Sequence, residues 1–391
     1  MRILHVIANL DLQLGGPSRA CIEMARAVAA AGHEVAVYTT DWSVEGRTDL
    51  PNDRPLLRDG VAYRYFRHRW HDGWCWSWPL ARALWRDAGR FDLVHLHSLY
   101  LFHSLVAPRA ARAAGVPYLL RPHGTLDPAV WPRRRWAKAP IELAFQNRDI
   151  EAAAALHYTS EDERLLARPY ARGRPSLVVP LGLATGDYAE LPAPGGFRAA
   201  HPGVGDRPIL LFLGRLDAKK GLDLLVPAFA RLVAGGADLQ LVLAGPDRGA
   251  RAGAERRVAD LGLQGRVTFT GMLQGEAKRA ALADAALFVL PSYRENFGLA
   301  VVEAMASGLA VVISDQVAIW REVEADRAGW ICRTEVDSLS EALAAALADP
   351  QLLAERGRQA RASARARFDW ATVTPRLCDG YRAVVEGTLS P

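Results

Sequence analysis

Three segments of the sequence combine charged side chains with glycines in a pattern that suits anion binding. The first, Gly214–Gly221, reads GRLDAKKG and holds Arg215 and Lys220. It lies between a strand-like and a helix-like apolar run, so its amides lie at a helix start, which attracts anions. Arginine offers a planar fork to phosphate oxygens, and lysine offers a compact charge. The segment predicts a phosphate site, with a solvated basic turn as the alternative.

The second segment, residues 291–303, reads PSYRENFGLAVVE and carries two glutamates. Glu295 is expected in a loop, with the amides of residues 296–299 as free donors at the positive end of a following helix. Glu303 then lies about 7–8 Å further along the helix axis. Two carboxylates bracketing an anion site fit a ligand with hydroxyls on both sides of a diphosphate, as in a nucleotide sugar. The alternatives are a capping charge at Glu295 and a helix-face salt bridge at Glu303.

The third segment, residues 121–128, reads RPHGTLDP and places His123 at the end of a predicted strand. A single histidine is more often structural than catalytic. The loop with Gly15 and Gly16 resembles a nucleotide loop, but it lacks the Gly-x-Gly-x-x-Gly fingerprint. No acidic residue other than Asp41 ends the second strand at the position expected for a ribose. This counts against a dinucleotide-dependent dehydrogenase.

The composition narrows the class of protein. The chain has 391 residues, 50% of them hydrophobic and 23% charged, which is an ordinary globular composition for two or three domains. The formal charge of +5 permits acidic partners without selecting one. The basic residues are mostly arginine, and the only lysines are Lys138, Lys219, Lys220 and Lys278.

Several features are absent from the sequence. No apolar run approaches the roughly 18 residues of a membrane-spanning helix, and the start of the chain does not resemble a signal peptide. Four scattered cysteines without metal-ligand spacing indicate a reduced, cytoplasmic protein with inert thiols. No Asp-x-Asp occurs, which removes one common way of holding a cation against a diphosphate.

The elements that position these segments alternate between strands and helices. In the first half, apolar runs predict strands, with a helix of period 3.6 after the first of them. In the second half the same pattern restarts, and a helix is expected over residues 222–234. The predicted strands span 3–8, 34–40, 92–97, 117–121, 208–213, 239–244, 266–270, 287–290 and 310–314.

This alternation predicts an α/β fold of two Rossmann-like, doubly wound parallel-sheet domains that face each other across a cleft. The segment LPAPGG from residue 191 suits a linker. The expected final helix, residues 369–386, is interrupted near Pro375. The predicted boundaries are 1–190 for the N-terminal domain, 191–206 for the linker, 207–368 for the C-terminal domain and 369–391 for the terminal helix.

Together these motifs resemble retaining glycosyltransferases of family 4, which have the GT-B fold. The resemblance covers nearly the whole chain. Its most specific part is the Glu-x7-Glu segment from Glu295 to Glu303, within PSYRENFGLAVVEAMASGLAVVISD. GRLDAKKG, RPHGTLDP, the early GGPSRACIEMARAVAAAGHEVAVYTT and VPLGL before the linker support it. In this family the terminal helix returns to the N-terminal domain.

The resemblance implies a role for each matching residue. Arg215 and Lys220 bind the donor diphosphate and stabilise charge on the departing nucleotide, without a metal or another cofactor. Glu303 receives the ribose hydroxyls, and His123 hydrogen-bonds the donor sugar near the reacting carbon. The catalytic residues are then His123, Arg215, Lys220 and Glu295. The remaining donor-binding residues are Gly16, Asn296, Phe297, Gly298 and Leu299.

The resemblance also implies retention of anomeric configuration by same-face attack through an ion-pair-like transition state. A diphosphate oxygen assists deprotonation of the acceptor. A double displacement with two carboxylates is the alternative mechanism.

The acceptor side is less defined. In this family the N-terminal domain binds the acceptor, and here that domain is rich in tryptophan and arginine. Aromatic–basic surfaces suit anionic bilayers and lipid-linked acceptors, so we expect attachment to the cytoplasmic face of the inner membrane. Packing of the tryptophans beneath loops is the alternative. The residues concerned are Trp70, Trp74, Trp76, Trp78, Trp85, Arg64, Arg67, Arg69, Arg82 and Arg86, and the run 131–138.

The expected activity is transfer of a hexose from a UDP- or GDP-linked donor to a glycan or lipid-linked acceptor, in bacterial exopolysaccharide or lipopolysaccharide synthesis. Another GT-B enzyme such as an epimerase or phosphorylase, transfer to a small soluble acceptor, and a non-catalytic sugar-binding module are the alternatives. Nucleic acid is a poor partner, because no recognition motif accompanies the charge.

Overall fold

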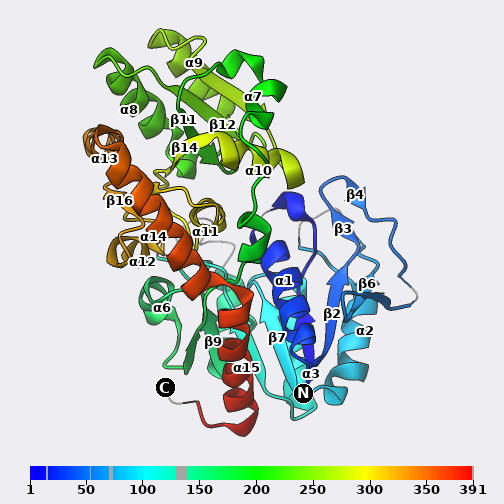
Figure 1. Cartoon of the computed structure of the whole chain (residues 1–391). Coiled ribbons are helices and arrows are strands. Elements are labelled where there is room, and N and C mark those ends of the chain that lie inside the picture. Colours follow the sequence, from blue (N-terminus) through cyan, green and yellow to red (C-terminus); the bar gives the residue numbers. More distant parts are fainter. Residues whose placement is uncertain (15, 53, 70–73, 129–138, 390–391) are drawn as a thin grey trace. The chain divides into compact units, whose positions relative to one another are not determined.

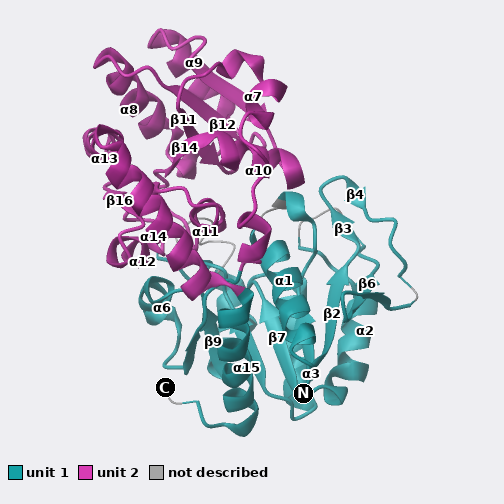
Figure 2. Ribbon diagram, viewed as in Figure 1, with its two compact units in different colours: residues 1–182, 370–391 teal, residues 183–369 magenta. Residues whose placement is uncertain are grey.

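The structure is a computed structural model, and it describes residues 1–14, 16–52, 54–69, 74–128 and 139–389. The chain divides into two compact units, coloured separately in Figure 2. Unit 1 comprises Met1–Gly182 and Trp370–Pro391, and unit 2 comprises Leu183–Asp369.

Unit 1 is built on an eight-stranded sheet, shown in the lower part of Figure 1. Every neighbouring pair is parallel except β5 and β6. In spatial order the strands are β10 (Ser176–Val178), β9 (Ala155–Tyr158), β8 (Tyr118–Arg121), β7 (Leu93–His97), β1 (Arg2–Val6), β2 (Glu34–Thr40), β6 (Val61–Phe66) and β5 (Leu56–Arg58). A separate two-stranded ribbon pairs β3 (Trp42–Ser43) with β4 (Gly46–Arg47).

The first helix of unit 1 buries an apolar stripe. In α1 the buried Cys21, Met24, Ala25 and Val28 recur at the spacing of one helix face. The α-helices are α1 (Gly16–Ala30), α2 (Trp78–Asp87), α3 (Phe102–Ala113), α5 (Asn147–Glu151), α6 (Glu161–Ala167) and α15 (Trp370–Glu386). Short 3₁₀ turns are η1 (Leu12–Leu14), η2 (Ala88–Arg90) and η4 (Arg168–Tyr170), and η3 (Glu142–Gln146) is π-helical.

The terminal helix α15 belongs to unit 1 and contacts α1. The predicted interruption near Pro375 is wrong, because the helix runs unbroken from Trp370 to Glu386. A proline removes one backbone donor. Pro375 is the sixth residue of the helix, and the fully buried Val373, Leu377 and Tyr381 around it fix the helix on the core.

Unit 2 is built on a six-stranded, fully parallel sheet. All five residues of β11 are buried, as is expected of a strand covered on both faces. In spatial order the strands are β13 (Val267–Gly271), β12 (Gln240–Ala244), β11 (Ile209–Leu213), β14 (Ala285–Leu290), β15 (Val311–Ser314) and β16 (Gly329–Cys332).

The helices of unit 2 mostly connect successive strands in βαβ fashion; the first of them precedes β11 and the last two follow β16. They are α7 (Gly196–Ala200), α8 (Leu222–Ala234), α9 (Arg251–Asp260), α10 (Gly275–Asp284), α11 (Leu299–Ala306), α12 (Trp320–Ala325), α13 (Val336–Ala348) and α14 (Pro350–Phe368). The 3₁₀ turns are η5 (Thr185–Tyr188), η6 (Pro202–Val204) and η7 (Ala218–Lys220).

Residues 191–206, predicted as a linker, lie inside unit 2. Two oxygens of the Asp284 carboxylate hold this stretch, accepting hydrogen bonds from the amides of Gly195 and Arg198. The stretch before it is tied to the end of the unit, because the Leu183 amide donates to the Phe368 carbonyl over 2.7 Å. The first segment of unit 1 therefore ends at Gly182, where the sequence predicted a boundary at residue 190.

Both units are Rossmann-like, which confirms the predicted fold class of two doubly wound parallel sheets. None of the helices among the described residues combines the length and the hydropathy that crossing a membrane requires.

Candidate active site

The central strands of unit 2 meet at a topological switch point. From β11 the chain winds outward through β12 to β13, and from β14 it winds the opposite way through β15 to β16. Ligands of open α/β sheets bind at the carboxyl ends of the strands at such a point. The two loops that carry Arg215, Lys220 and Glu295 follow β11 and β14 directly.

These two loops are locked together by backbone contacts. Gly221 has a φ of +71°, and a Cβ there would lie 2.1 Å from the carbonyl oxygen of Pro291. The Tyr293 amide also donates to the Lys219 carbonyl over 2.8 Å. Only glycine fits this conformation and this separation. The side chains of the two loops are thereby held at a fixed distance.

Lys220 and Glu295 form an ion pair between the loops, from Nζ to Oε2. Lys220 is buried. The backbone of Glu295 is fixed as well, because its amide donates to the Gln316 carbonyl and its own carbonyl accepts from the Ala318 amide, both over 3.0 Å. Burial alone would raise the pKa of Glu295, but the charges of Lys220, Lys219 and Arg215 together lower it. Glu295 is therefore held as a carboxylate.

The surroundings of Glu295 are strongly cationic. Arg215 is one-third exposed, and its Nη2 lies 3.8 Å from Asp217 Oδ2. Burial lowers the pKa of Lys219 against the opposing charge of Glu295, and the neighbouring charges of Lys220 and Arg215 lower it further by smaller amounts. Three cations (Arg215, Lys219 and Lys220) thus lie near two carboxylates (Glu295 and Asp217), so the group carries a net positive charge for a bound anion such as a diphosphate.

The loop after β14 ends at the N-terminus of α11. Gly298 caps this helix with a φ of +89°, and a Cβ there would lie 3.0 Å from Val317 Cγ1. The amides of Phe297, Gly298 and Leu299 make no hydrogen bond to any residue within the described ranges. These amides are donors at the positive end of the helix, in the same loop as Glu295.

Glu303 lies on α11 and is 4% exposed. Its Oε1 accepts hydrogen bonds from Lys278 Nζ at 2.6 Å and from the Tyr188 hydroxyl at 2.8 Å. The burial agrees with the apolar neighbours of Glu303 in the sequence.

The two partners of Glu303, Lys278 and Tyr188, are residues that the sequence did not identify. Lys278, on α10, is one of the four lysines of the chain, and that scarcity was the one signal that could have pointed to it.

In unit 1, His123 follows β8 and adopts a φ of +51°. Its Nε2 lies 3.1 Å from Nδ1 of His97, at the end of the neighbouring strand β7. Gly124 donates its amide to the carboxylate of Glu163 over 2.9 Å, which fixes the loop. His123 is therefore one member of a group of histidines rather than an isolated ring.

Gly16 is the first residue of α1, directly after the loop that follows β1. A Cβ at Gly16 would meet no atom of the described residues within 4 Å. Its predicted neighbour in the loop, Gly15, lies outside the described residues.

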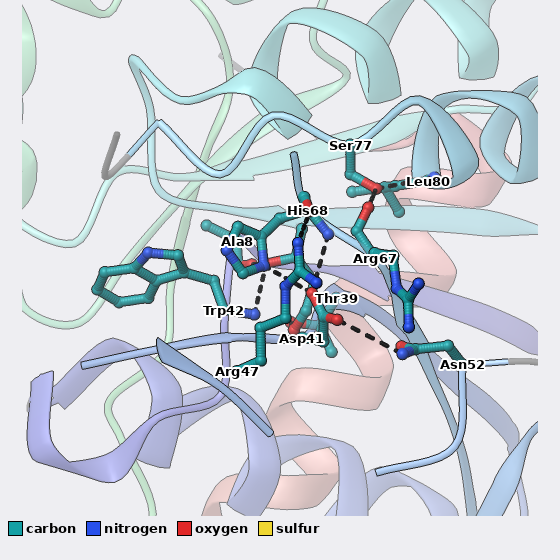
Figure 3. A network of polar contacts seen from close by, with 11 residues as sticks. Ala8, Thr39, Asp41, Trp42, Arg47, Asn52, Arg67, His68, Ser77 and Leu80 are labelled. Atoms are coloured by element: carbon teal, nitrogen blue, oxygen red, sulfur yellow. Dashed lines mark hydrogen bonds and ion pairs between the residues drawn. The ribbon is translucent and has the colours of Figure 1, made fainter. Parts of the chain in front are cut away.

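Asp41, the one acidic residue near the ribose position of a dinucleotide fold, is not available to a ligand (Figure 3). It is 1% exposed, and its Oδ1 lies 2.6 Å from His68 Nδ1 and accepts from the His68 amide over 2.8 Å. Its Oδ2 accepts from Asn52 over 3.4 Å. Asp41 instead links the loops that follow β2 and β6.

One group of described residues has metal-ligating atoms close together. His5, Cys21 and His97 are buried and offer ligand atoms within 4.8 Å of one another. The environment is unfavourable for a cation, because burial and the positive charge of Arg121 lower the pKa of His5 to about 3. The two histidines also contact each other directly, with His5 Nδ1 2.9 Å from His97 Nε2.

The predicted site residues therefore fall into two sets. Unit 2 brings Arg215, Lys220, Glu295, Asn296, Phe297, Gly298 and Leu299 to one edge of its sheet, with Glu303 further along α11. Unit 1 holds Gly16 and His123 after β1 and β8.

Two family models match the chain, one in each half. The model for Glycosyltransferase Family 4 matches residues 14–185, and the model for Glycosyl transferases group 1 matches residues 197–363. A phosphatidyl-myo-inositol mannosyltransferase from Mycolicibacterium smegmatis is 34% identical over 387 residues, covering 95% of this chain and 90% of that protein. A GDP-mannose:cellobiosyl-diphosphopolyprenol alpha-mannosyltransferase from Xanthomonas oryzae is 27% identical, covering 97% and 96%.

Solved structures share the fold over the whole chain. Sucrose-phosphate synthase from Thermosynechococcus elongatus has a TM-score of 0.76 at 21% identity, covering 99% of this chain and 100% of that one. The Anabaena protein HepE, solved in complex with UDP and glucose, has a TM-score of 0.75 at 19% identity, covering 98% and 100%.

Proposed function

The chain belongs to glycosyltransferase family 4, and on that premise we propose that it transfers a hexose from a nucleotide-diphosphate sugar to a lipid-linked or glycan acceptor, with retention of configuration. The observation that carries this proposal is the Lys220–Glu295 pair with Arg215 at the switch point of unit 2. This arrangement supplies fixed positive charge where a nucleotide diphosphate leaves.

The chemistry is electrostatic. The anomeric carbon loses its bond to the diphosphate oxygen and gains a bond to the acceptor hydroxyl oxygen, and the hydroxyl proton passes to the departing diphosphate. Arg215 and Lys220 stabilise the negative charge that develops on the leaving group, the role that a bound metal ion has in other enzymes. We therefore propose a metal-independent reaction.

Retention follows from attack on the same face as the leaving group. A double displacement needs one carboxylate as nucleophile and a second as acid and base. Glu295 is paired with Lys220, and Glu303 is held by Lys278 and Tyr188. These contacts favour donor binding for both carboxylates, with Glu295 toward the sugar and Glu303 toward the ribose.

Mannose is the hexose that we favour. The relatives from Mycolicibacterium smegmatis and Xanthomonas oryzae, which match nearly the whole chain, are both named mannosyltransferases. Their names also specify lipid or lipid-linked acceptors. The Anabaena structure contains UDP, so UDP-linked donors are tested beside GDP-linked ones.

We further propose that unit 1 meets its acceptor at an anionic bilayer on the cytoplasmic face of the membrane, in exopolysaccharide or lipopolysaccharide synthesis. On α2, Trp78 is 48% exposed and Trp85 is 55% exposed, and the exposed Arg82 and Arg86 lie on the same face of the helix. Tryptophan and arginine together suit the interface of an anionic bilayer.

Trp74 and Trp76 are half-buried, unlike Trp78 and Trp85. They pack against each other and against Phe102, at centroid distances of 5.6, 6.3 and 4.7 Å, which matches the packing alternative. Trp78 also contacts this cluster edge-on, with centroid distances of 5.2 Å to Trp76 and 6.3 Å to Phe102. Trp70 and the run 131–138 lie outside the described residues.

The activity is tested with a panel of UDP- and GDP-linked hexoses, each offered with a polyprenyl-diphosphate glycan, a phosphatidylinositol and a soluble disaccharide. We expect transfer from GDP-mannose to a lipid-linked acceptor, with an α-linked product by NMR. Inversion at the anomeric carbon would contradict the retaining mechanism. Turnover of the donor without transfer, as in an epimerase, would contradict the proposed reaction.

Membrane attachment is tested by sedimentation with vesicles of phosphatidylcholine alone or with phosphatidylglycerol. We expect binding only to the anionic vesicles, weakened by salt and by the double variant Trp78→Ser/Trp85→Ser. Leu57→Ser is the control, because Leu57 is also in unit 1 and is 75% exposed on β5. Equal binding by the double variant and the control would contradict the assignment to α2.

A further inference from the structure

One face of the unit 1 sheet carries a row of buried histidines. His5 on β1, His95 and His97 on β7, and His157 on β9 are all 0% exposed. His95 and His97 are two residues apart on one strand, so both rings lie on the same face. A buried ring nitrogen needs a hydrogen-bond partner, because an unpaired polar group in the core is costly.

The partners within this row are mostly other histidines. His95 Nδ1 lies 2.7 Å from the Tyr381 hydroxyl on α15, and His95 Nε2 lies 3.3 Å from His157 Nδ1. His157 Nε2 in turn lies 3.1 Å from the Val179 carbonyl. This first chain of contacts therefore ends on a residue other than histidine at both ends, Tyr381 and Val179.

The second chain differs from the first. His5 Nδ1 lies 2.9 Å from His97 Nε2, and His97 Nδ1 lies 3.1 Å from His123 Nε2. At the inner end, His5 Nε2 is buried and has no hydrogen-bond partner among the residues that the structure describes. At the outer end is the ring of His123. Its Nε2 contacts His97, and its Nδ1 takes no part in this row of contacts.

The three rings are neutral. Burial, the neighbouring histidines and the charge of Arg121 place the pKa of His97 well below its ordinary value, and burial and Arg121 do the same for His5 and His123. A neutral imidazole carries one N–H and one acceptor nitrogen. Each contact in the chain therefore has one donor and one acceptor, and only two arrangements of protons satisfy both contacts.

The two arrangements differ at the inner end. If His123 donates to His97 and His97 donates to His5, the proton of His5 must lie on Nε2, where it has no acceptor within the described part of the chain. If His5 donates from Nδ1 and His97 donates from Nδ1, then His5 Nε2 is a bare lone pair and His123 accepts at Nε2. A buried N–H without an acceptor is rarer and costlier than an unused acceptor.

We propose that His5 and His97 are positioning residues that hold His123 as its Nδ1–H tautomer, so that this ring presents a neutral hydrogen-bond donor beyond the end of β8. That His123 donates this bond to a donor-sugar oxygen rests on the function proposed above. A neutral donor suits that place, because an imidazolium would repel the positive charge that develops on a sugar ring during transfer.

The backbone supports the same orientation. The φ of +51° at His123 is rare for a residue with a side chain, and it turns the chain directly after the strand. Glu163 holds the next residue, because its Oε1 accepts from the Gly124 amide and its Oε2 accepts from the Thr159 amide over 2.7 Å. The ring of His123 is thus fixed from its backbone and from Nε2, which leaves Nδ1 as its one remaining polar atom.

The proposal is tested on the full chain labelled with ¹⁵N-histidine, by two-bond ¹H–¹⁵N correlation spectra, which distinguish the two tautomers. His123→Gln assigns the signals. We expect His123 to be the Nδ1–H tautomer in the unmodified protein. An Nε2–H tautomer there would overturn the proposal.

Two substitutions of His97 form a matched pair. His97→Asn keeps an N–H donor near the position of Nδ1 and should keep the tautomer of His123. His97→Leu removes that donor and should release His123 into a mixture of tautomers. His33→Asn, at a half-buried histidine of unit 1 outside both chains, is the control. An unchanged His123 signal in a folded His97→Leu protein would contradict the role of His97.

Turnover gives the second readout. We expect His97→Leu to lower kcat about tenfold, the effect of one lost hydrogen bond, with the affinity for the free nucleotide unchanged and with recovery in His97→Asn. A fall in kcat that is equal in both variants would contradict positioning through the tautomer. Should no donor be turned over at all, the proposed function fails, while the tautomer spectra still decide the positioning of His123.

Discussion

Gly221 lies so close to Pro291 that a Cβ at residue 221 would meet the Pro291 carbonyl oxygen at 2.1 Å. This contact joins the loop after β11 to the loop after β14.

Gly221→Ala should therefore separate Lys220 from Glu295 and strain the backbone at residue 221, which has a φ of +71°. We expect weaker binding of UDP and GDP by calorimetry and a lower Tm. Gly203→Ala is the control, because nothing lies within 4 Å of a Cβ there. Equal effects of the two substitutions would contradict this role of Gly221.

Lys220→Met removes the partner of the Glu295 carboxylate. We expect kcat to fall by about 10²–10³, the usual effect of losing one group that stabilises developing charge. The pKa of Glu295 should rise, because burial then acts with less opposing charge, and the acid limb of the kcat profile should move to higher pH. Arg256→Met, at an exposed cation on α9, is the control. Wild-type kcat in Lys220→Met would show that the diphosphate assignment is wrong.

Glu303 and Lys278 should act together on the nucleoside. Glu303→Ala removes the acceptor for ribose hydroxyls, so the Kd for GDP or UDP should rise while the Kd for inorganic pyrophosphate stays the same. Lys278→Met should have a similar but smaller effect, because Tyr188 still holds the carboxylate. Calorimetry with both ligands measures the difference. A parallel loss of pyrophosphate affinity would place Glu303 near the phosphates instead.

The stability of unit 1 should fall below pH 6.5. Burial lowers the pKa of His5 to about 3 and of His103 to about 4, and the pKa values of His95, His97 and His157 lie well below the ordinary value. Because the unfolded chain binds protons at these residues first, unfolding takes up protons between pH 6.5 and about 4. Each histidine then removes about 1.4 kcal/mol of unfolding free energy per pH unit within its range.

Two buried acids oppose this trend. Burial raises the pKa of Asp149 and of Glu163, so in their own ranges the folded state binds the extra protons. The histidines outnumber these two acids, and the net effect is a loss of stability on acidification. Urea unfolding at pH 7, 6 and 5, followed by circular dichroism, measures the change. A free energy of unfolding that is constant from pH 7 to pH 5 would contradict the neutral, buried state of these rings.

Removal of divalent metal should leave activity intact. Arg215 and Lys220 supply the positive charge at the diphosphate, and the sequence has no Asp-x-Asp. Turnover is compared before and after dialysis against EDTA, with added Mg²⁺ or Mn²⁺ as the reference. Complete loss of turnover that either ion restores would overturn the metal-free mechanism.

Much of the fold could be predicted from the sequence, because buried parallel strands are continuous apolar runs. Those of unit 2, such as β11 and β15, agree with expectation to within one or two residues. The edge strand β16 was missed. It is four residues long and begins at Gly329, where a Cβ would lie 2.0 Å from the Val311 carbonyl oxygen. The need for a glycine at residue 329 comes from the neighbouring strand β15, so the residues around Gly329 carry no pattern that predicts a strand.

The candidate site was predictable where its residues share a loop. The family resemblance drawn from GRLDAKKG and the Glu-x7-Glu segment is confirmed by the two family models. The contacts of Glu303 were not predictable, because Lys278 and Tyr188 lie far from it in the sequence and reach it only through tertiary packing. The roles of the individual site residues stay predictions.

The histidines of unit 1 show the same limit. His95 and His97 alternate along a predicted strand, which indicates a shared face, but their partners come from β1, β9 and α15. The sequence could not predict which side chains these histidines contact, because those contacts depend on the order of the strands in the sheet. Of the histidines, the sequence identified only His123 as a candidate site residue, from its position beside a glycine after a strand.

The membership of α15 in unit 1 sets an order of events during synthesis. Val373, Leu377 and Tyr381 complete a core whose other walls are made from residues 1–182. On the ribosome, unit 1 emerges first but keeps that face uncovered until residues 370–386 have emerged. Unit 2, continuous from Leu183 to Asp369, can close its own core earlier. The half of the protein that is translated first is thus the half that finishes folding last, and during that interval it is exposed to chaperones and to aggregation.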